Sequence, residues 1–182
     1  MIYRSVLFLS FLTFTLLLQG CLMFHSVSYE IKLDSESSGT VTVTVDDIRS
    51  TAMNSKELNE DKEILFQFLE KSEDFIIQMK EEGKNITSRE LFVVNDKLNS
   101  RVEYSFDDIT KVEAIVYDEP FYYLTLALDD SVISTNGELI QSTEHKRIIW
   151  DNTMGSLKFS MFGEETTGRN LVRMAQYYKN DK

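Results

Sequence analysis

The sequence predicts an α+β fold, in which an antiparallel sheet of about eight strands carries one long helix and a C-terminal helix on one face. Three observations predict it. Two consecutive segments near the N-terminus alternate strictly between apolar and polar residues, one long segment then follows the helical period, and alternating segments return over most of the remaining chain. Because strands that follow one another as hairpins pair antiparallel, the sheet is expected to be built from hairpins, with the helices covering its apolar face.

The first predicted hairpin joins residues 27–33 to residues 40–47. In both segments the apolar side chains fall on one face and the polar side chains on the other. The inward positions are Val27, Tyr29, Ile31, Leu33, Val41, Val43 and Val45. The stretch DSESSG between the segments is rich in turn-forming residues, so the two segments are expected to pair as a β-hairpin.

Residues 54–82 predict the long helix, because their apolar side chains recur at the helical period and form a wide stripe. Asn54 with Glu57 three residues later is a typical capping pair at the start of a helix, and Gly83 is placed to end it. The wide stripe indicates a helix that packs across a sheet. A shorter helix is predicted over Arg169–Tyr178.

Alternating segments predict the remaining strands. A hairpin is expected around the turn at residues 95–97, followed by a helical turn at 107–114 and by the aromatic run PFYYLTLAL. Asn136-Gly137 is the strongest short hairpin signal in the chain, because this dipeptide favours the tight turns that join two strands. The other strands expected are Glu90–Val94, Arg101–Phe106, His145–Trp150 and Leu157–Phe162.

The N-terminal residues predict export from the cytoplasm. Arg4 is the only charged residue before an uncharged stretch that runs from Ser5 to Phe24. The apolar part, residues 6–18, has the length of a signal-peptide segment, whereas a spanning helix needs roughly 20 apolar residues. The alternative is an uncleaved membrane helix over residues 5–24. With Arg4 retained on the cytoplasmic side, both alternatives put the rest of the chain across the membrane.

The only cysteine in the chain, Cys21, follows directly on this apolar segment. Leu18-Gln19-Gly20-Cys21 resembles the lipobox of bacterial lipoproteins, with an apolar residue three positions before the cysteine and a small residue next to it. The resemblance implies cleavage between Gly20 and Cys21 and lipidation of Cys21, and hence anchorage in the cell membrane or the outer membrane. Two or three acyl chains hold a protein on a bilayer essentially permanently.

This resemblance divides the chain into three parts. A signal peptide occupies residues 1–20, a lipidated N-terminus with a short tether occupies 21–26, and one α+β domain is expected over 27–182. The mature domain also loosely resembles LppM-type bacterial lipoprotein domains in its opening hairpin, long helix and further hairpins. That resemblance implies a fold and no site residues.

The charge of the chain excludes nucleic acid as a partner. The formal net charge is −11, and it becomes −12 when Arg4 is removed with the signal peptide. Nucleic-acid binding needs a basic stripe that neutralises phosphates, and the sequence contains none. The carboxylate excess is expected to keep the domain soluble.

The sequence predicts no enzyme and no cofactor. Only two histidines exist, His25 close to the lipidated cysteine and His145 among charged residues, and no hydrolase motif accompanies them. Neighbouring carboxylates on a strand point to opposite faces, so they are expected to be solvated strand ends without a metal ion. These pairs are Asp46-Asp47, Asp107-Asp108, Asp129-Asp130 and Glu164-Glu165.

Aromatic residues supply the one candidate binding surface, which comprises Tyr122, Tyr123, Trp150 and Phe162. Alternation assigns neighbouring rings to opposite faces of a strand, so some are expected to emerge on the polar side of the sheet. An exposed aromatic patch often marks a ligand or partner surface, although aromatic side chains on strands more often fill a core.

Three functions remain open at this point. The leading hypothesis is a membrane-anchored, non-enzymatic envelope lipoprotein that binds an envelope protein or a small apolar ligand. The alternatives are a lipid-anchored periplasmic hydrolase and a structural or assembly lipoprotein without a ligand.

Overall fold

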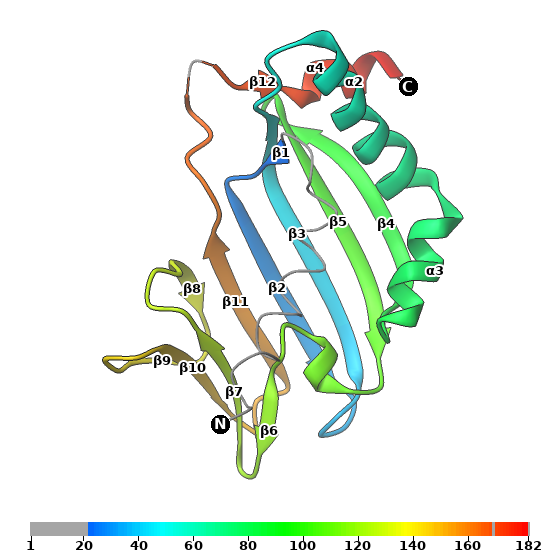
Figure 1. The fold of residues 1–182 in the computed structure, drawn as a ribbon. Helices are drawn as coiled ribbons and strands as arrows, with labels where there is room; N and C mark the ends of the chain where they lie inside the picture. Colours follow the sequence, from blue (N-terminus) through cyan, green and yellow to red (C-terminus); the bar gives the residue numbers. More distant parts are fainter. Residues whose placement is uncertain (1–21, 169, 182) are drawn as a thin grey trace, which may run out of the picture.

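The computed structural model describes residues 22–168 and 170–181, and it is an α+β structure with two antiparallel sheets and a helical layer (Figure 1). The α+β class and the eight-stranded antiparallel sheet are therefore confirmed. The signal peptide, Gly20 and Cys21 lie outside the described residues.

The large sheet has the strand order β4-β5-β3-β2-β11-β8, and β1 and β12 both pair with the end of β3. Both predicted N-terminal and central hairpins are present, as β2–β3 and β4–β5. The strands are β1 (Leu22–Met23), β2 (Ser26–Leu33), β3 (Gly39–Ser50), β4 (Asn85–Val94), β5 (Lys97–Phe106), β8 (Val132–Thr135), β11 (Ser156–Phe162) and β12 (Val172–Arg173). Because Leu22 and Ser26 already belong to strands, the described part of 21–26 is built into the sheet and forms no free tether.

The alternation predicted for β2 and β3 separates the two faces of the large sheet. Tyr29, Ile31, Val41 and Val43 are buried on the inner face. On the outer face polar side chains pair across the strands; for example, the Lys158 ammonium lies 3.0 Å from a Glu30 carboxylate oxygen. One face of this sheet is therefore a core surface and the other is polar.

The carboxylate of Asp47, predicted to be a solvated strand end, is instead buried, and this prediction is wrong. A bulge in β3 between Val45 and Ile48 places Asp47 in a left-handed backbone conformation, with φ 53°. Its carboxylate accepts hydrogen bonds from Arg49 Nε at 2.6 Å and from Thr166 Oγ1 at 2.8 Å. The bulge bends β3 toward β1 and β12, and the buried ion pair fixes that bend.

A second, smaller sheet covers the lower half of the inner face (Figure 1). Its strand order is β6-β7-β10-β9. The strands are β6 (Val116–Asp118), β7 (Phe121–Leu126), β9 (Glu138–Gln141) and β10 (Lys146–Asp151). The core between the two sheets includes the stacked rings of Tyr29 and Phe159, whose centroids are 4.7 Å apart. The sequence had predicted one sheet, and the second sheet is a correction to it.

Asn136-Gly137 does not close a hairpin, although the dipeptide predicts one. The flanking strands β8 and β9 belong to different sheets, because β8 pairs with β11 and β9 pairs with β10. The Asn136 side chain accepts hydrogen bonds from Trp150 Nε1 at 2.9 Å and from the Lys158 backbone N–H at 2.7 Å. Asn136 therefore joins the two sheets where the chain passes between them.

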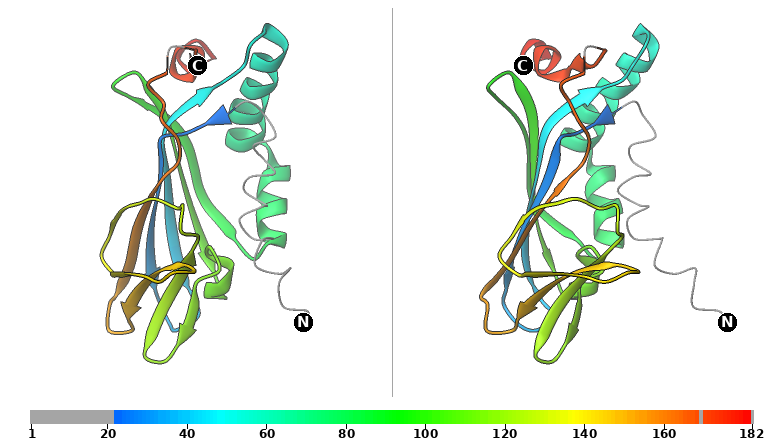
Figure 2. Two further views of the ribbon diagram at one scale, coloured as in Figure 1. Left: turned by 60° about the vertical axis from the view of Figure 1, so that its left-hand side comes forward. Right: turned by 90° about the vertical axis from the view of Figure 1, so that its left-hand side faces the viewer.

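The helical layer consists of α2 (Ser55–Lys62), the π-helix η1 (Glu63–Leu69) and α3 (Glu73–Glu81), which stand over the upper half of the inner face (Figure 2). The predicted start and end are confirmed: Asn54 caps α2, and Gly83 with φ 83° follows α3. The single helix predicted over 54–82 is divided, however. Ser72 leaves the helical conformation (ψ 132°) and caps the start of α3 through its hydroxyl, so a new helix begins here.

The C-terminal helix α4 (Met174–Asp181) begins later than predicted. Ala175 and Tyr178 are buried, and the Tyr178 hydroxyl donates a hydrogen bond to the Leu91 carbonyl at 2.6 Å. The predicted helical turn after β5 is the 3₁₀ turn η2 (Ile109–Lys111). The helix α4 borders the core cluster around Val45, Leu65 and Leu91, whereas Ile109 of η2 belongs to the core between the two sheets.

Candidate functional site

The aromatic residues predicted as a binding surface do not form one. Tyr122 and Trp150, which face each other across β7 and β10, are only 2% and 0% exposed. Their polar groups are satisfied internally, because the Tyr122 hydroxyl donates to the Glu36 carbonyl and Trp150 Nε1 donates to Asn136. These two assignments are wrong, since the second sheet folds its aromatic face onto the core.

Tyr123 and Phe162 do lie outside that core, but in different sheets. Tyr123 is half-buried on β7 beneath the Arg147 guanidinium, which is 5.1 Å from the ring centroid. Phe162 at the end of β11 is 38% exposed and meets the His25 ring edge to face at 5.4 Å. The four predicted residues therefore share no surface.

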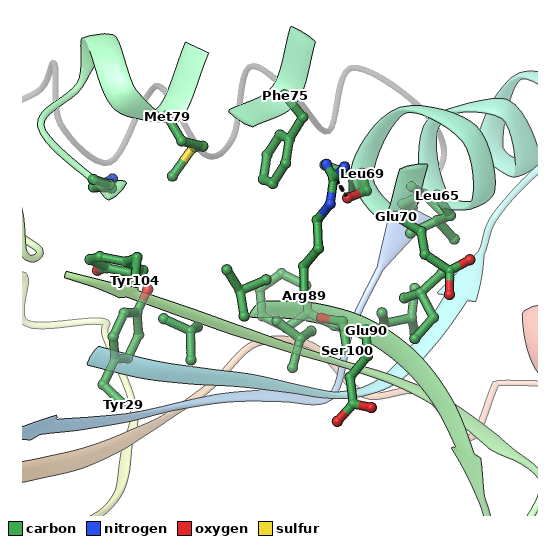
Figure 3. Close-up of a pocket in the computed structure, with 18 of the residues that line it drawn as sticks. Tyr29, Leu65, Leu69, Glu70, Phe75, Met79, Arg89, Glu90, Ser100 and Tyr104 are labelled. Atoms are coloured by element: carbon green, nitrogen blue, oxygen red, sulfur yellow. Dashed lines mark hydrogen bonds between the residues drawn. The ribbon is translucent and has the colours of Figure 1, made fainter. Parts of the chain in front are cut away.

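The structure instead has an apolar cavity of about 100 Å³ between the helical layer and the inner face of the large sheet (Figure 3). Leu65, Leu69, Phe75 and Met79 line it from the helical side. The sheet contributes Tyr29, Val43, Val45, Ile48, Arg89, Leu91, Ser100, Val102 and Tyr104, and the N-terminal segment contributes Leu22, Met23 and Phe24. Such a mostly apolar space with a few polar groups is typical of a small-molecule site.

Arg89 occupies an inward position of β4, in line with Leu91, where alternation calls for an apolar residue. Its Nη1 donates to the backbone carbonyls of Leu69 at 3.3 Å and Ser72 at 2.7 Å, where the helical layer breaks. The guanidinium also lies 5.8 Å from the centroid of the Phe75 ring. Arg89 thus connects the sheet to the helical layer across the cavity and holds the break in place.

Polar side chains gather at one end of the cavity, around Tyr29 and Tyr104, which lie side by side below Met79 in Figure 3. The Tyr29 hydroxyl donates a hydrogen bond to Glu113 Oε1 at 2.8 Å. Burial raises the pKa of the Glu113 carboxyl, while the bond from Tyr29 and the nearby Lys84 ammonium act against this rise. Burial also raises the pKa values of both tyrosines, so their hydroxyls stay protonated and can donate hydrogen bonds.

The Tyr104 hydroxyl differs from that of Tyr29. The Tyr104 side chain lines the cavity and the residue is only 3% exposed, yet its hydroxyl has no hydrogen-bond partner among the described residues. This group is therefore available to a molecule in the cavity.

At the other end of the cavity, Leu22 packs with the core cluster that contains Leu65. Leu22 pairs with Ser50 at the end of β3, so its position is fixed by the sheet. It is also the residue that follows Cys21.

The histidines are not arranged for catalysis in the part of the chain that the structure describes. The His25 ring lies against Phe162, and its Nδ1 is buried without a hydrogen-bond partner. His145 lies in a turn, and its own backbone carbonyl accepts hydrogen bonds from the backbone N–H and the hydroxyl of Ser142. Within the same described residues, no group of three or more potential metal ligands occurs.

Comparisons with known proteins add no family. No protein-family model matches the chain, and no curated protein or solved structure matches it either. No helix within residues 22–168 and 170–181 is long and apolar enough to cross a membrane.

Sequence reasoning missed the cavity and its polar residues. Arg89 was the available signal, because a charged residue among inward positions indicates a special site. Glu113 carried no such signal: it follows a short helical turn and adopts φ 52°, which local sequence patterns do not predict.

Proposed function

We propose that this chain is a lipid-anchored binding protein of a bacterial cell envelope and that it holds a small apolar ligand in the cavity between the helical layer and the large sheet. The observation that carries the proposal is the cavity itself, whose lining is mostly apolar on both sides, with Glu70 as the charged residue on the helical side. Burial of apolar ligand surface there is favourable at about 25 cal/mol per Å².

The size of the cavity limits the ligand. A group the size of a water molecule needs about 10–15 Å³ of cavity volume. A cavity of about 100 Å³ therefore has room for roughly seven to ten such groups, which corresponds to an alkyl chain of about eight carbons. This is a ligand much smaller than a diacyl lipid.

The anchor part of the proposal depends on the lipobox at Leu18–Cys21. Cys21 directly precedes Leu22, a lining residue, so a lipid on Cys21 would leave the cavity close to the bilayer in which apolar molecules accumulate. Intact-mass analysis of protein extracted from membranes tests this part. We expect a chain that begins at Cys21 and carries covalent lipid, and a chain with residues 1–20 and a free thiol would contradict the anchor.

Photolabelling tests the binding part. The full chain is purified from membranes, transferred from detergent into a peptide scaffold and irradiated with an eight-carbon hydrocarbon that carries a diazirine. We expect the label on lining residues such as Val102 and Met79, and we expect excess octane to prevent it. Labelling confined to exposed side chains, such as Ile140, would contradict a binding cavity.

A second candidate function, contact with an envelope protein, is favoured by strand β9. It is an edge strand of the small sheet, and its residues Leu139 and Ile140 are 47% and 46% exposed. Exposed apolar edge strands are typical sites of strand addition by another chain. In cells, a photoreactive residue at position 140 should crosslink to one envelope protein, whereas a crosslink to no protein would remove this candidate.

A further inference from the structure

We propose that the ligand of the cavity is an uncharged single-chain amphiphile, whose hydroxyl or carbonyl group binds at the Tyr29–Tyr104 end while its alkyl chain extends toward Leu65. This inference rests on the proposed function, because it names the ligand class of the same cavity. Three features of the polar end carry it.

The first feature is the unpartnered hydroxyl of Tyr104. It belongs to a residue that lines the cavity and makes no hydrogen bond to a described residue, whereas the neighbouring Tyr29 hydroxyl is already bonded to Glu113. A ligand oxygen at this end of the cavity can accept a hydrogen bond from the Tyr104 hydroxyl. A pure hydrocarbon would leave that donor without a partner.

The second feature is the acceptor capacity of Glu113. The carboxyl group has two oxygens, and Tyr29 bonds to only one of them, Oε1. A hydroxyl group near Tyr104 can therefore accept from the tyrosine and donate to the carboxyl group. This pairing fits an alcohol or a monoglyceride better than an ether.

The third feature is the charge around the polar end. Two carboxyl groups, those of Glu82 and Glu113, influence Tyr104. One cation that lines the cavity, the Lys84 ammonium, lies 3.4 Å from a Glu82 carboxylate oxygen. An anionic headgroup such as a fatty-acid carboxylate would thus enter a buried place where acidic groups outnumber basic ones, which is unfavourable.

The opposite end of the cavity supplies the apolar environment for the chain. Leu65 and Leu69 line it there and are separated along the cavity from Tyr29 and Tyr104 (Figure 3). The charged residues towards this end, Glu70, Arg89 and Glu90, are already bonded to the Tyr178 hydroxyl, to backbone carbonyls and to Arg101. The Tyr104 hydroxyl at one end and the leucine side chains at the other therefore match the two ends of an amphiphile.

Competition against the diazirine hydrocarbon tests this inference on the full chain. At pH 8, where octanoate is ionised, we expect 1-octanol to halve the cavity labelling at a concentration at least tenfold lower than octanoate. In the Tyr104→Phe variant, the octanol concentration that halves the cavity labelling should rise about fivefold to tenfold, because one hydrogen bond is lost. Labelling of this variant by the hydrocarbon without competitor is measured alongside, as a check that the cavity is still present.

The matched control is Tyr123→Phe, which removes a tyrosine hydroxyl outside the cavity and should change neither measurement. The inference is overturned if octanoate competes as well as octanol or if Tyr104→Phe leaves octanol competition unchanged. If the variant failed to fold, the octanol–octanoate comparison on the wild-type chain would still decide. Failure of the proposed function is distinct, because the hydrocarbon would then label no lining residue of the wild type.

Discussion

Filling the cavity should stabilise the protein and at the same time prevent ligand binding. Val102 lies on β5 between Val43 and Arg89 of the neighbouring strands and lines the cavity. Replacing it by phenylalanine places an aromatic ring into the empty space. The same substitution in a tightly packed core would be destabilising by about 1–3 kcal/mol, so the sign of the effect is informative.

The magnitude follows from the cavity volume. An empty cavity lowers stability by about 24 cal/mol per Å³. For a cavity of about 100 Å³ this amounts to about 2.4 kcal/mol. A phenylalanine ring that fills about half of the space should therefore raise the free energy of unfolding by about 1 kcal/mol.

Urea unfolding measures this change. The only tryptophan, Trp150, is fully buried, so its fluorescence reports unfolding directly. In the Val102→Phe variant we expect a higher urea midpoint with an unchanged slope and at least tenfold less labelling by the diazirine hydrocarbon. The control is Val94→Phe, a residue that is 48% exposed at the end of β4, which should change neither quantity. Lower stability of Val102→Phe together with full labelling would refute the reasoning.

Three further substitutions test the packing around the site. Asp47→Asn should lower stability by about 3 kcal/mol at pH 7. Burial opposes ionisation of Asp47, but hydrogen bonds from Arg49 and Thr166 outweigh burial and lower its pKa. The loss of unfolding free energy in the variant, measured by urea titration, should therefore shrink as the pH falls below about 4. A loss that does not depend on pH would contradict the ion pair. Asn136→Ala should lower stability by about 2 kcal/mol, because the buried Trp150 Nε1–H and the Lys158 backbone N–H lose their acceptor, and a thermal melt identical to wild type would exclude the assigned role. Arg89→Met should lower it by about 2 kcal/mol and accelerate amide exchange in α3, whereas unchanged exchange would show that the break in the helical layer is held by other contacts.

Local patterns predicted the hairpins well. The β2–β3 and β4–β5 pairs follow from alternation with a short connection, because the turn fixes the register of two strands that are adjacent in sequence. Gly83 and Asn54 marked the ends of the helical region for equally local reasons.

Which strands share a sheet could not be predicted in the same way. β8 and β9 are separated by two residues, yet each pairs with a strand from later in the chain. The Asn136-Gly137 signal reports only local turn preference, and the long-range bonds of the Asn136 side chain override it. The same limitation explains Trp150 and Tyr122: alternation assigned them to a face, but it could not tell that a second sheet would bury that face.

The division of the helical region also depends on tertiary contacts. Residues 54–82 follow the helical period throughout, so the sequence favours one helix. The carbonyls of Leu69 and Ser72 accept instead from Arg89, a residue of the following strand. The cavity lies beneath this break. Because both depend on contacts between residues far apart in the sequence, local patterns predicted neither the break nor the cavity.

Native mass spectrometry of the full chain, released gently from envelope membranes, tests the central claim most directly. The account predicts a polypeptide that begins at Cys21, carries covalent lipid and holds one small uncharged amphiphile, which collisional activation removes and which the Val102→Phe variant lacks. A polypeptide of all 182 residues without a bound molecule, identical in wild type and variant, would contradict it.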